Sequence, residues 1–215
     1  MGTGLRRAAS VIAGRDGRPG LEILVVERGA GNRFLPGYVA FPGGSIDAED
    51  AALAERWFGT PEEAARACAV RELLEELGVA LTAGGLVPSD GRSRAPIDRS
   101  PPDPSLLAPI AHWVAPKRVP VRFDADYFAV AAPPELEPRP DGGEVARAWW
   151  TSPERLLAEW RDGARKLYWP TLFTVRSLAE CSNVSELLAV QIRTREPYAD
   201  EESLYPRSTF WQEPA

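Results

Sequence analysis

The sequence is poor in cysteine and histidine, with two cysteines and one histidine among 215 residues. Cys68 and Cys181 are too few for the disulfide framework that stabilises small secreted domains. The single histidine, His112, falls in a predicted strand, where a lone histidine is usually packed or at the surface, so we leave it out of the candidate site. These shortages exclude a disulfide-rich scaffold and favour a reducing cytoplasm.

Long apolar runs and an excess of basic residues are also missing. No stretch is apolar over the length needed to span a bilayer, and nothing resembles a signal peptide. The net charge is −6, which argues against general binding of nucleic acid, because phosphate backbones are held mainly by Lys and Arg. We therefore expect one soluble cytoplasmic domain over residues 1–215 that binds neither nucleic acid nor membrane.

A predicted helix that begins at residue 61 carries the strongest functional signal. Residues three and four apart share one face of a helix, so Glu72, Glu75 and Glu76 would lie together. An apolar stripe with helical spacing runs beside them and consists of Val70, Leu73, Leu74 and Leu77. Three glutamates alone would be better explained by a solvated acidic face, and the residues upstream change this interpretation.

Both ends of this helix carry sequence signals. Thr60 is a favourable N-cap, Pro61 suits the first helical position, and Glu63 completes a predicted capping box with Thr60. Gly78 is predicted to end the helix, because helices commonly end at a residue with a left-handed backbone, and this residue is usually glycine.

The segment from Phe41 to Val79 resembles the Nudix box. The family pattern is Gly, five residues, Glu, seven residues and then REUxEExGU, where U is aliphatic. Here FPGG occupies residues 41–44, and Glu63 is followed after seven residues by RELLEELGV. Gly44 and Glu63 are separated by 18 residues instead of five, so we place an insert at residues 47–59. We expect this insert to form a short packed helix.

The resemblance implies an α/β fold, an α/β/α sandwich with a mixed sheet, and a hydrolase of a nucleoside diphosphate linked to another group. It implies Mg²⁺ or Mn²⁺ as cofactor, which suits hard oxygen ligands. The implied metal ligands, whose glutamates are also the candidate catalytic residues, are Glu72, Glu75, Glu76, Glu144 and the carbonyl of Gly43. Glu63 and Arg71 would hold the helix and its loop in register. Glu144, which precedes the last predicted strand, could also be a solvated turn acid, and the choice of general base stays open.

Two further segments resemble the coenzyme A diphosphatase branch of the family, and the second resembles the part of that branch that has an insert in the box. In the first segment, three residues separate Arg33 from Gly37 and three more separate Gly37 from FPGG. The second segment extends from Trp113 to Phe128 and contains the sequences WVAP and RFDADYF. The resemblance implies coenzyme A or an acyl derivative as substrate, with Arg28 and Arg33 as candidate substrate-binding residues. A surface ion pair is the alternative role for Arg33. ADP-ribose or a nucleotide sugar is the alternative substrate, and a catalytically silent binding module is the alternative class.

The remaining chain predicts strands over residues 8–13, 21–27, 106–114, 121–131 and 146–151. Residues 88–104 are rich in Pro, Ser and Asp without periodicity, which predicts a mobile surface loop. Additional helices are expected in a C-terminal extension over 152–194. The tail, 195–215, contains the aromatic residues Tyr198, Tyr205, Phe210 and Trp211. They favour docking on this chain or on a partner subunit, which makes a homodimer a hypothesis.

Overall fold

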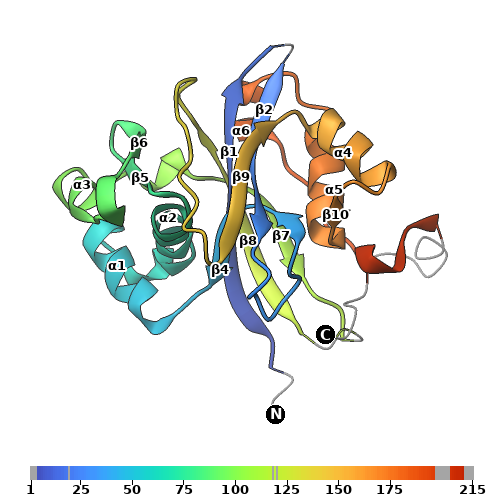
Figure 1. The fold of residues 1–215 in the computed structure, drawn as a ribbon. Helices are drawn as coiled ribbons and strands as arrows, with labels where there is room; N and C mark the ends of the chain where they lie inside the picture. Colours follow the sequence, from blue (N-terminus) through green and yellow to red (C-terminus); the bar gives the residue numbers. More distant parts are fainter. Residues whose placement is uncertain (1–3, 19, 118, 120, 197–203, 211–215) are drawn as a thin grey trace.

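A mixed β-sheet forms the centre of the protein (Figure 1). The computed structural model describes residues 4–18, 20–117, 119, 121–196 and 204–210. The sheet has eight strands in the order β10-β3-β2-β1-β8-β7, with β4 also paired to β1 and β9 to β2. The strands are β1 (Arg6–Asp16), β2 (Leu21–Arg28), β3 (Tyr38–Ala40), β4 (Gly43–Ser45), β7 (Ala108–Val114), β8 (Phe123–Ala131), β9 (Val145–Thr151) and β10 (Lys166–Leu167).

The central part of β1 is buried on both faces, which explains why residues 8–13 are apolar except for Ser10. It runs parallel to β8 and antiparallel to β2 and β4. Ala9 and Val11 point to one side of the sheet and pack in one core, whereas Ala8 and Ile12 pack in a second core on the other side. The strand therefore separates two hydrophobic layers.

Helices cover both faces of the sheet, which confirms the predicted sandwich with additional C-terminal helices (Figure 1). On one face lie α1 (Ala48–Phe58) and α2 (Ala64–Leu77), and on the other lie α4 (Pro153–Arg161) and α5 (Trp169–Leu178). The described residues also form the hairpin β5 (Val79–Thr82) and β6 (Gly85–Pro88), α3 (Ala95–Arg99), α6 (Val184–Ala189) and 3-10 turns at Pro61–Glu63, Asp90–Arg92, Pro104–Leu106 and Arg207–Thr209. Within the described part of the chain, no helix has the length and apolarity to cross a membrane.

The start of the glutamate-bearing helix differs from the prediction. Residues Pro61–Glu63 form a 3-10 turn, and the α-helix begins at Ala64. The Thr60 side chain caps no backbone N–H, and the Glu63 carboxylate pairs with Arg66. The predicted capping box is therefore wrong, because this ion pair occupies Glu63. Gly78 ends α2 with φ 63°, as predicted.

The insert forms α1, as predicted, and α1 packs beside α2. Leu53 and Trp57 are buried in the same core as the apolar face of α2. The segment over residues 88–104 was expected to be a mobile surface loop, but residues 95–99 within it form the short helix α3. Ile97 is fully buried and the indole of Trp57 donates to Asp98 at 3.0 Å, which ties α3 to α1.

The aromatic residues of the described tail dock on their own chain. Phe210 is 2% exposed, and the ring of Tyr205 lies 5.4 Å from that of Trp160 on α4. Tyr198 and Trp211 lie outside the described residues. Intramolecular docking is thus confirmed for two of the four tail aromatics, and the homodimer stays a prediction.

Candidate active site

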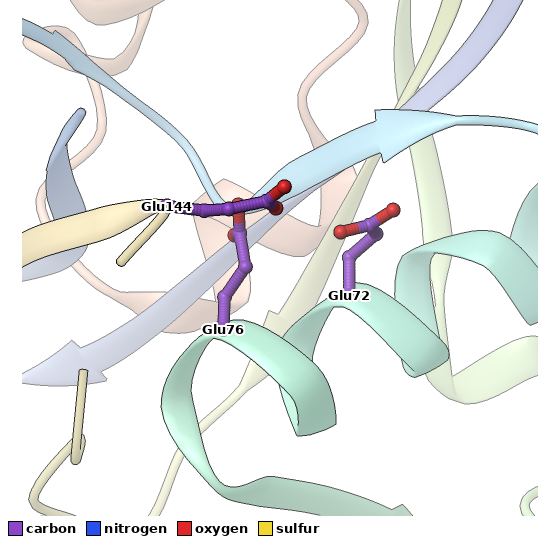
Figure 2. Close-up of side chains that lie close together, drawn as sticks. All are labelled: Glu72, Glu76 and Glu144. Carbon is purple, nitrogen blue, oxygen red and sulfur yellow. The ribbon is translucent and has the colours of Figure 1, made fainter. Parts of the chain in front are cut away.

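Three carboxylates converge beside β4 (Figure 2). Glu72 and Glu76 are one helical turn apart on α2, so both reach the same side of the helix. Glu144 reaches them from the turn before β9. Each of the three offers an oxygen atom that lies within 4.8 Å of the other two. The structure therefore brings together three of the four glutamates that the sequence singles out.

The turn that carries Glu144 is fixed through its backbone. The Asp141 carboxylate accepts hydrogen bonds from the backbone N–H groups of Glu144 (3.0 Å) and Val145 (2.8 Å). The Glu144 carbonyl accepts from the Gly29 N–H at 2.9 Å and from the Asn32 amide at 2.7 Å. These contacts fix the backbone of the turn, from which the exposed Glu144 side chain reaches over α2 (Figure 2).

The two carboxylates from α2 are buried, and their electrostatics are unfavourable without a cation. Burial, together with the charge of Glu72, raises the pKa of Glu76 to about 8. Burial also raises the pKa of Glu72 to about 7, although the neighbouring Arg71 opposes this. Such groups resist ionisation because the charged form has lost its water. A divalent cation would offset this penalty, and oxygen ligands of this kind suit Mg²⁺ or Mn²⁺, so the donor set fits these ions.

Two glycines in β4 allow the backbone to approach the carboxylates. A Cβ at Gly44 would lie 2.2 Å from Oε1 of Glu72, so a side chain there would displace that carboxylate. Gly43 has φ 155°, and a Cβ there would lie 2.3 Å from the Ala9 carbonyl. The Gly43 N–H donates to Oε2 of Glu76 at 3.2 Å. The two glycines of FPGG therefore allow β4 to lie close to both β1 and the carboxylates of α2.

Glu75 lies apart from the three-carboxylate cluster. Its side chain is 44% exposed and accepts from Arg71 at 3.0 Å and from Arg94 at 3.0 Å. Arg94 precedes α3 and also contacts Glu49 of α1 at 3.3 Å. Glu75 therefore lies between two arginines, and a metal role for it requires its side chain to leave Arg94.

The box arginine, Arg71, is held by an aspartate that the sequence analysis did not consider. Asp50, at 0% exposed, accepts from Arg71 through both oxygens, at 2.8 and 3.1 Å. Arg71 also donates to Glu72 at 2.9 Å and to the Ser45 carbonyl at 3.2 Å. Asp50 and Glu72 raise the pKa of Arg71 above its usual value despite burial, so the guanidinium stays charged.

Glu63 and Arg71, which were both expected to hold the helix and its loop in register, contact different partners. Glu63 pairs with Arg66, and Asp50 takes the place next to Arg71. Five residues separate Gly44 from Asp50, the spacing that the family pattern has between its Gly and Glu. The extra residues therefore follow the acidic position of the box instead of preceding it. Asp50 could have been found from the sequence by taking the acidic residue with the family spacing from Gly44 and accepting Asp in place of Glu.

The two candidate substrate-binding arginines have different positions. Arg28 lines the cavity described below, but its guanidinium donates to the Phe34 carbonyl at 3.0 Å and to the Asn32 side chain at 2.9 Å. It therefore shapes the loop between β2 and β3. Arg33 is exposed and lies outside the cavity lining. The structure does not place either guanidinium free inside the cavity.

A cavity of about 480 Å³ opens beside the carboxylates. Its wall includes β1, β4, β8 and the first residues of α5, so it lies between the sheet and the C-terminal extension. The lining also includes aromatic side chains, among them Phe34, Phe41, Trp113, Phe123, Tyr127 and Trp169. The volume is within the range of about 300–1,000 Å³ typical of small-molecule sites. The sequence analysis did not predict this cavity, because the residues that line it come from separate parts of the chain.

Comparisons with known proteins indicate one class, the hydrolases of phosphoanhydride bonds. The model of the NUDIX domain matches residues 4–169. The crystal structure of a NUDIX hydrolase from Alicyclobacillus acidocaldarius is similar, with 32% sequence identity and a TM-score of 0.79, over 90% of this chain and 100% of that chain. A Caenorhabditis elegans protein described as putative nudix hydrolase 7 is 38% identical over 80 residues, which are 37% of this chain and 24% of that protein.

The chain therefore belongs to the Nudix hydrolase family. Members of this family typically use a divalent metal ion, and the acidic cluster of Glu72, Glu76 and Glu144 is present here.

Proposed function

We propose that the protein is an Mg²⁺- or Mn²⁺-dependent diphosphatase that cleaves a nucleoside diphosphate linked to a second moiety, with coenzyme A or an acyl-coenzyme A as the first candidate. The observation that carries this proposal is the cluster of Glu72, Glu76 and Glu144 at the edge of a cavity of about 480 Å³. The products would be two monophosphates.

The carboxylates of Glu72, Glu76 and Glu144 would hold the metal, with the Gly43 carbonyl as a further oxygen ligand beside them. When bound, the metal would neutralise the diphosphate and lower the pKa of an attacking water. Glu75, the remaining glutamate of the box, would join only after its side chain leaves Arg94. Glu72, Glu75, Glu76 and Glu144 are also the candidates for the general base.

Asp50 and Arg71 would position this centre without touching the substrate. Arg71 donates to Glu72 and is itself held by the buried Asp50. A fixed carboxylate loses less conformational entropy when it takes up its ligand, and it keeps the geometry that phosphoryl transfer needs. Arg33, which is exposed in the loop between β2 and β3, is a candidate contact for a phosphate that lies outside the cavity.

The choice of coenzyme A is supported by where two sequence segments lie. Trp113 and Ala115 of the WVAP segment line the cavity, and so do Phe123, Ala125 and Tyr127 of the RFDADYF segment. The residues that resemble the coenzyme A branch are therefore cavity residues. The alternatives, ADP-ribose or a nucleotide sugar, would use the same carboxylates.

Turnover of the purified protein with Mg²⁺ or Mn²⁺ tests the proposal. The panel consists of coenzyme A, acetyl-coenzyme A, ADP-ribose, NADH and diadenosine polyphosphates, and the products are identified by chromatography. Preference for the coenzyme A pair supports the proposal. Preference for ADP-ribose keeps the metal chemistry and overturns the substrate, and no turnover of any member favours a catalytically silent binding module.

A further inference from the structure

Three aromatic residues from distant parts of the chain meet on the wall of the cavity. Phe34 comes from the loop between β2 and β3, Phe123 from the first residue of β8, and Tyr168 from the N-cap of α5. The ring centroid of Phe34 lies 5.4 Å from that of Phe123 and 6.0 Å from that of Tyr168. All three side chains line the cavity and are partly exposed. They form a group that we call the aromatic wall.

The orientation of the aromatic wall leaves ring surface available. Phe34 is inclined by 62° to Phe123 and by 82° to Tyr168, so the rings meet edge to face. Aromatic pairs prefer this arrangement, and Phe34 and Phe123 stay partly exposed in it, so each keeps ring surface at the cavity. Because these side chains are partly exposed at a cavity, a flat ligand can lie against them.

The charges around the cavity argue against a phosphate in this part of it. In the described part of the chain, the cations among the lining residues are Arg28 and Arg71. Arg28 is engaged by Asn32 and the Phe34 carbonyl, and Arg71 is engaged by Asp50 and Glu72. Among the described residues, a second phosphate at this wall would therefore meet aromatic carbon and only guanidinium groups that already have partners. The moiety that suits this wall is uncharged.

We propose that the aromatic wall of Phe34, Phe123 and Tyr168 is the subsite for the nucleobase of the substrate. The assignment rests on the proposed function, because a nucleoside diphosphate must supply the base. A base has a flat face that stacks on aromatic rings, whereas a flexible chain gains no such face-to-face contact. Any additional phosphate on the ribose then lies outside the cavity, where the exposed Arg33 is found.

The test measures binding of adenosine, which has a base but no phosphate, to the metal-free protein in EDTA by ligand-observed saturation-transfer NMR. We expect Phe34→Ala to weaken adenosine binding by about 5- to 100-fold, the loss typical of one stacked base. The matched control is Phe58→Ala, which removes a partly buried phenylalanine of α1 that does not line the cavity. Ribose 5-phosphate, which lacks the base, should bind Phe34→Ala and the wild-type protein equally.

Several results would overturn the assignment. Adenosine that binds Phe34→Ala as well as it binds the wild type shows that the base lies elsewhere. Pantetheine binding that weakens in Phe34→Ala while adenosine binding does not places the flexible chain at the wall instead. If thermal unfolding shows that Phe34→Ala is unfolded, Phe123→Leu replaces it with the same expectation. Adenosine binding by a protein that turns over no diphosphate would remove the proposed function and keep this subsite.

Discussion

Glu76→Gln should stabilise the metal-free protein at alkaline pH. The Glu76 carboxylate is 5% exposed, lies beside Glu72, and accepts from the Gly43 N–H. Its pKa is raised from 4.5 to about 8, mainly by burial. Glutamine has nearly the same shape, keeps an acceptor for the Gly43 N–H, and cannot ionise. The substitution therefore removes an unfavourable charge and little else.

The sign and size follow from the pKa. Between about pH 4.5 and pH 8 the folded protein retains a proton on Glu76 that the unfolded chain has lost, so the free energy of unfolding falls as pH rises through this window. Each pKa unit corresponds to about 1.4 kcal/mol. A shift from 4.5 to about 8 therefore costs the wild type at most about 5 kcal/mol once Glu76 is ionised. The gain in Glu76→Gln should be near zero below pH 4.5 and approach this value above pH 8.

Urea unfolding of both proteins in EDTA, at about pH 5 and about pH 8.5, measures the difference. The matched control is Glu75→Gln, because Glu75 is 44% exposed and paired with two arginines, so its loss should not stabilise the protein. Added Mn²⁺ should stabilise the wild type and stabilise Glu76→Gln much less. A variant that is destabilised at both pH values, or a wild type whose stability does not change with pH, would refute the reasoning.

The other predictions concern contacts around the site. Asp50→Asn should cost about 3–5 kcal/mol in urea unfolding, because Arg71 loses the partner of a buried charge; a cost below about 1 kcal/mol would contradict the pairing. Arg94→Ala should change the free energy of unfolding by less than about 1 kcal/mol, since its ion pairs are exposed, and a larger loss in urea unfolding would show that they are stronger than exposed pairs usually are. Phe210→Ala should cost about 3–5 kcal/mol if the tail is docked in solution as it is here, and an unchanged melting temperature would show that it is not. Light scattering tests the expected homodimer, and the mass of a monomer at micromolar concentration would remove it.

The sequence was sufficient to predict elements whose signal is local. The glutamate spacing on α2 and the Gly78 stop are helix properties, and the apolar runs of β1 and β2 indicate buried strands. The positions of Glu72 and Glu76 followed directly, since residues four apart on a helix share a face. Glu144, the acidic residue before β9, was proposed from the family resemblance, and in the structure it lies beside Glu72 and Glu76 of α2.

Features that depend on packing between distant segments were missed. Asp50 meets Arg71 only because α1 folds back beside α2, so the pair is invisible in either segment alone. Glu75 turns toward Arg94, which lies in a stretch without periodicity. The aromatic wall joins residues 34, 123 and 168, whose separation in sequence leaves no local pattern. In each case a side-chain contact set by the tertiary fold decides the outcome.

Binding of Mn²⁺ measured by electron paramagnetic resonance tests the proposed metal centre most directly. The comparison needs the wild type, Glu72→Gln, Glu144→Gln and the control Glu63→Gln, whose carboxylate is paired with Arg66. The account predicts that Glu72→Gln and Glu144→Gln each lose at least about tenfold in Mn²⁺ affinity, whereas Glu63→Gln binds Mn²⁺ like the wild type. Equal affinity in all four proteins would contradict a metal centre built from Glu72, Glu76 and Glu144.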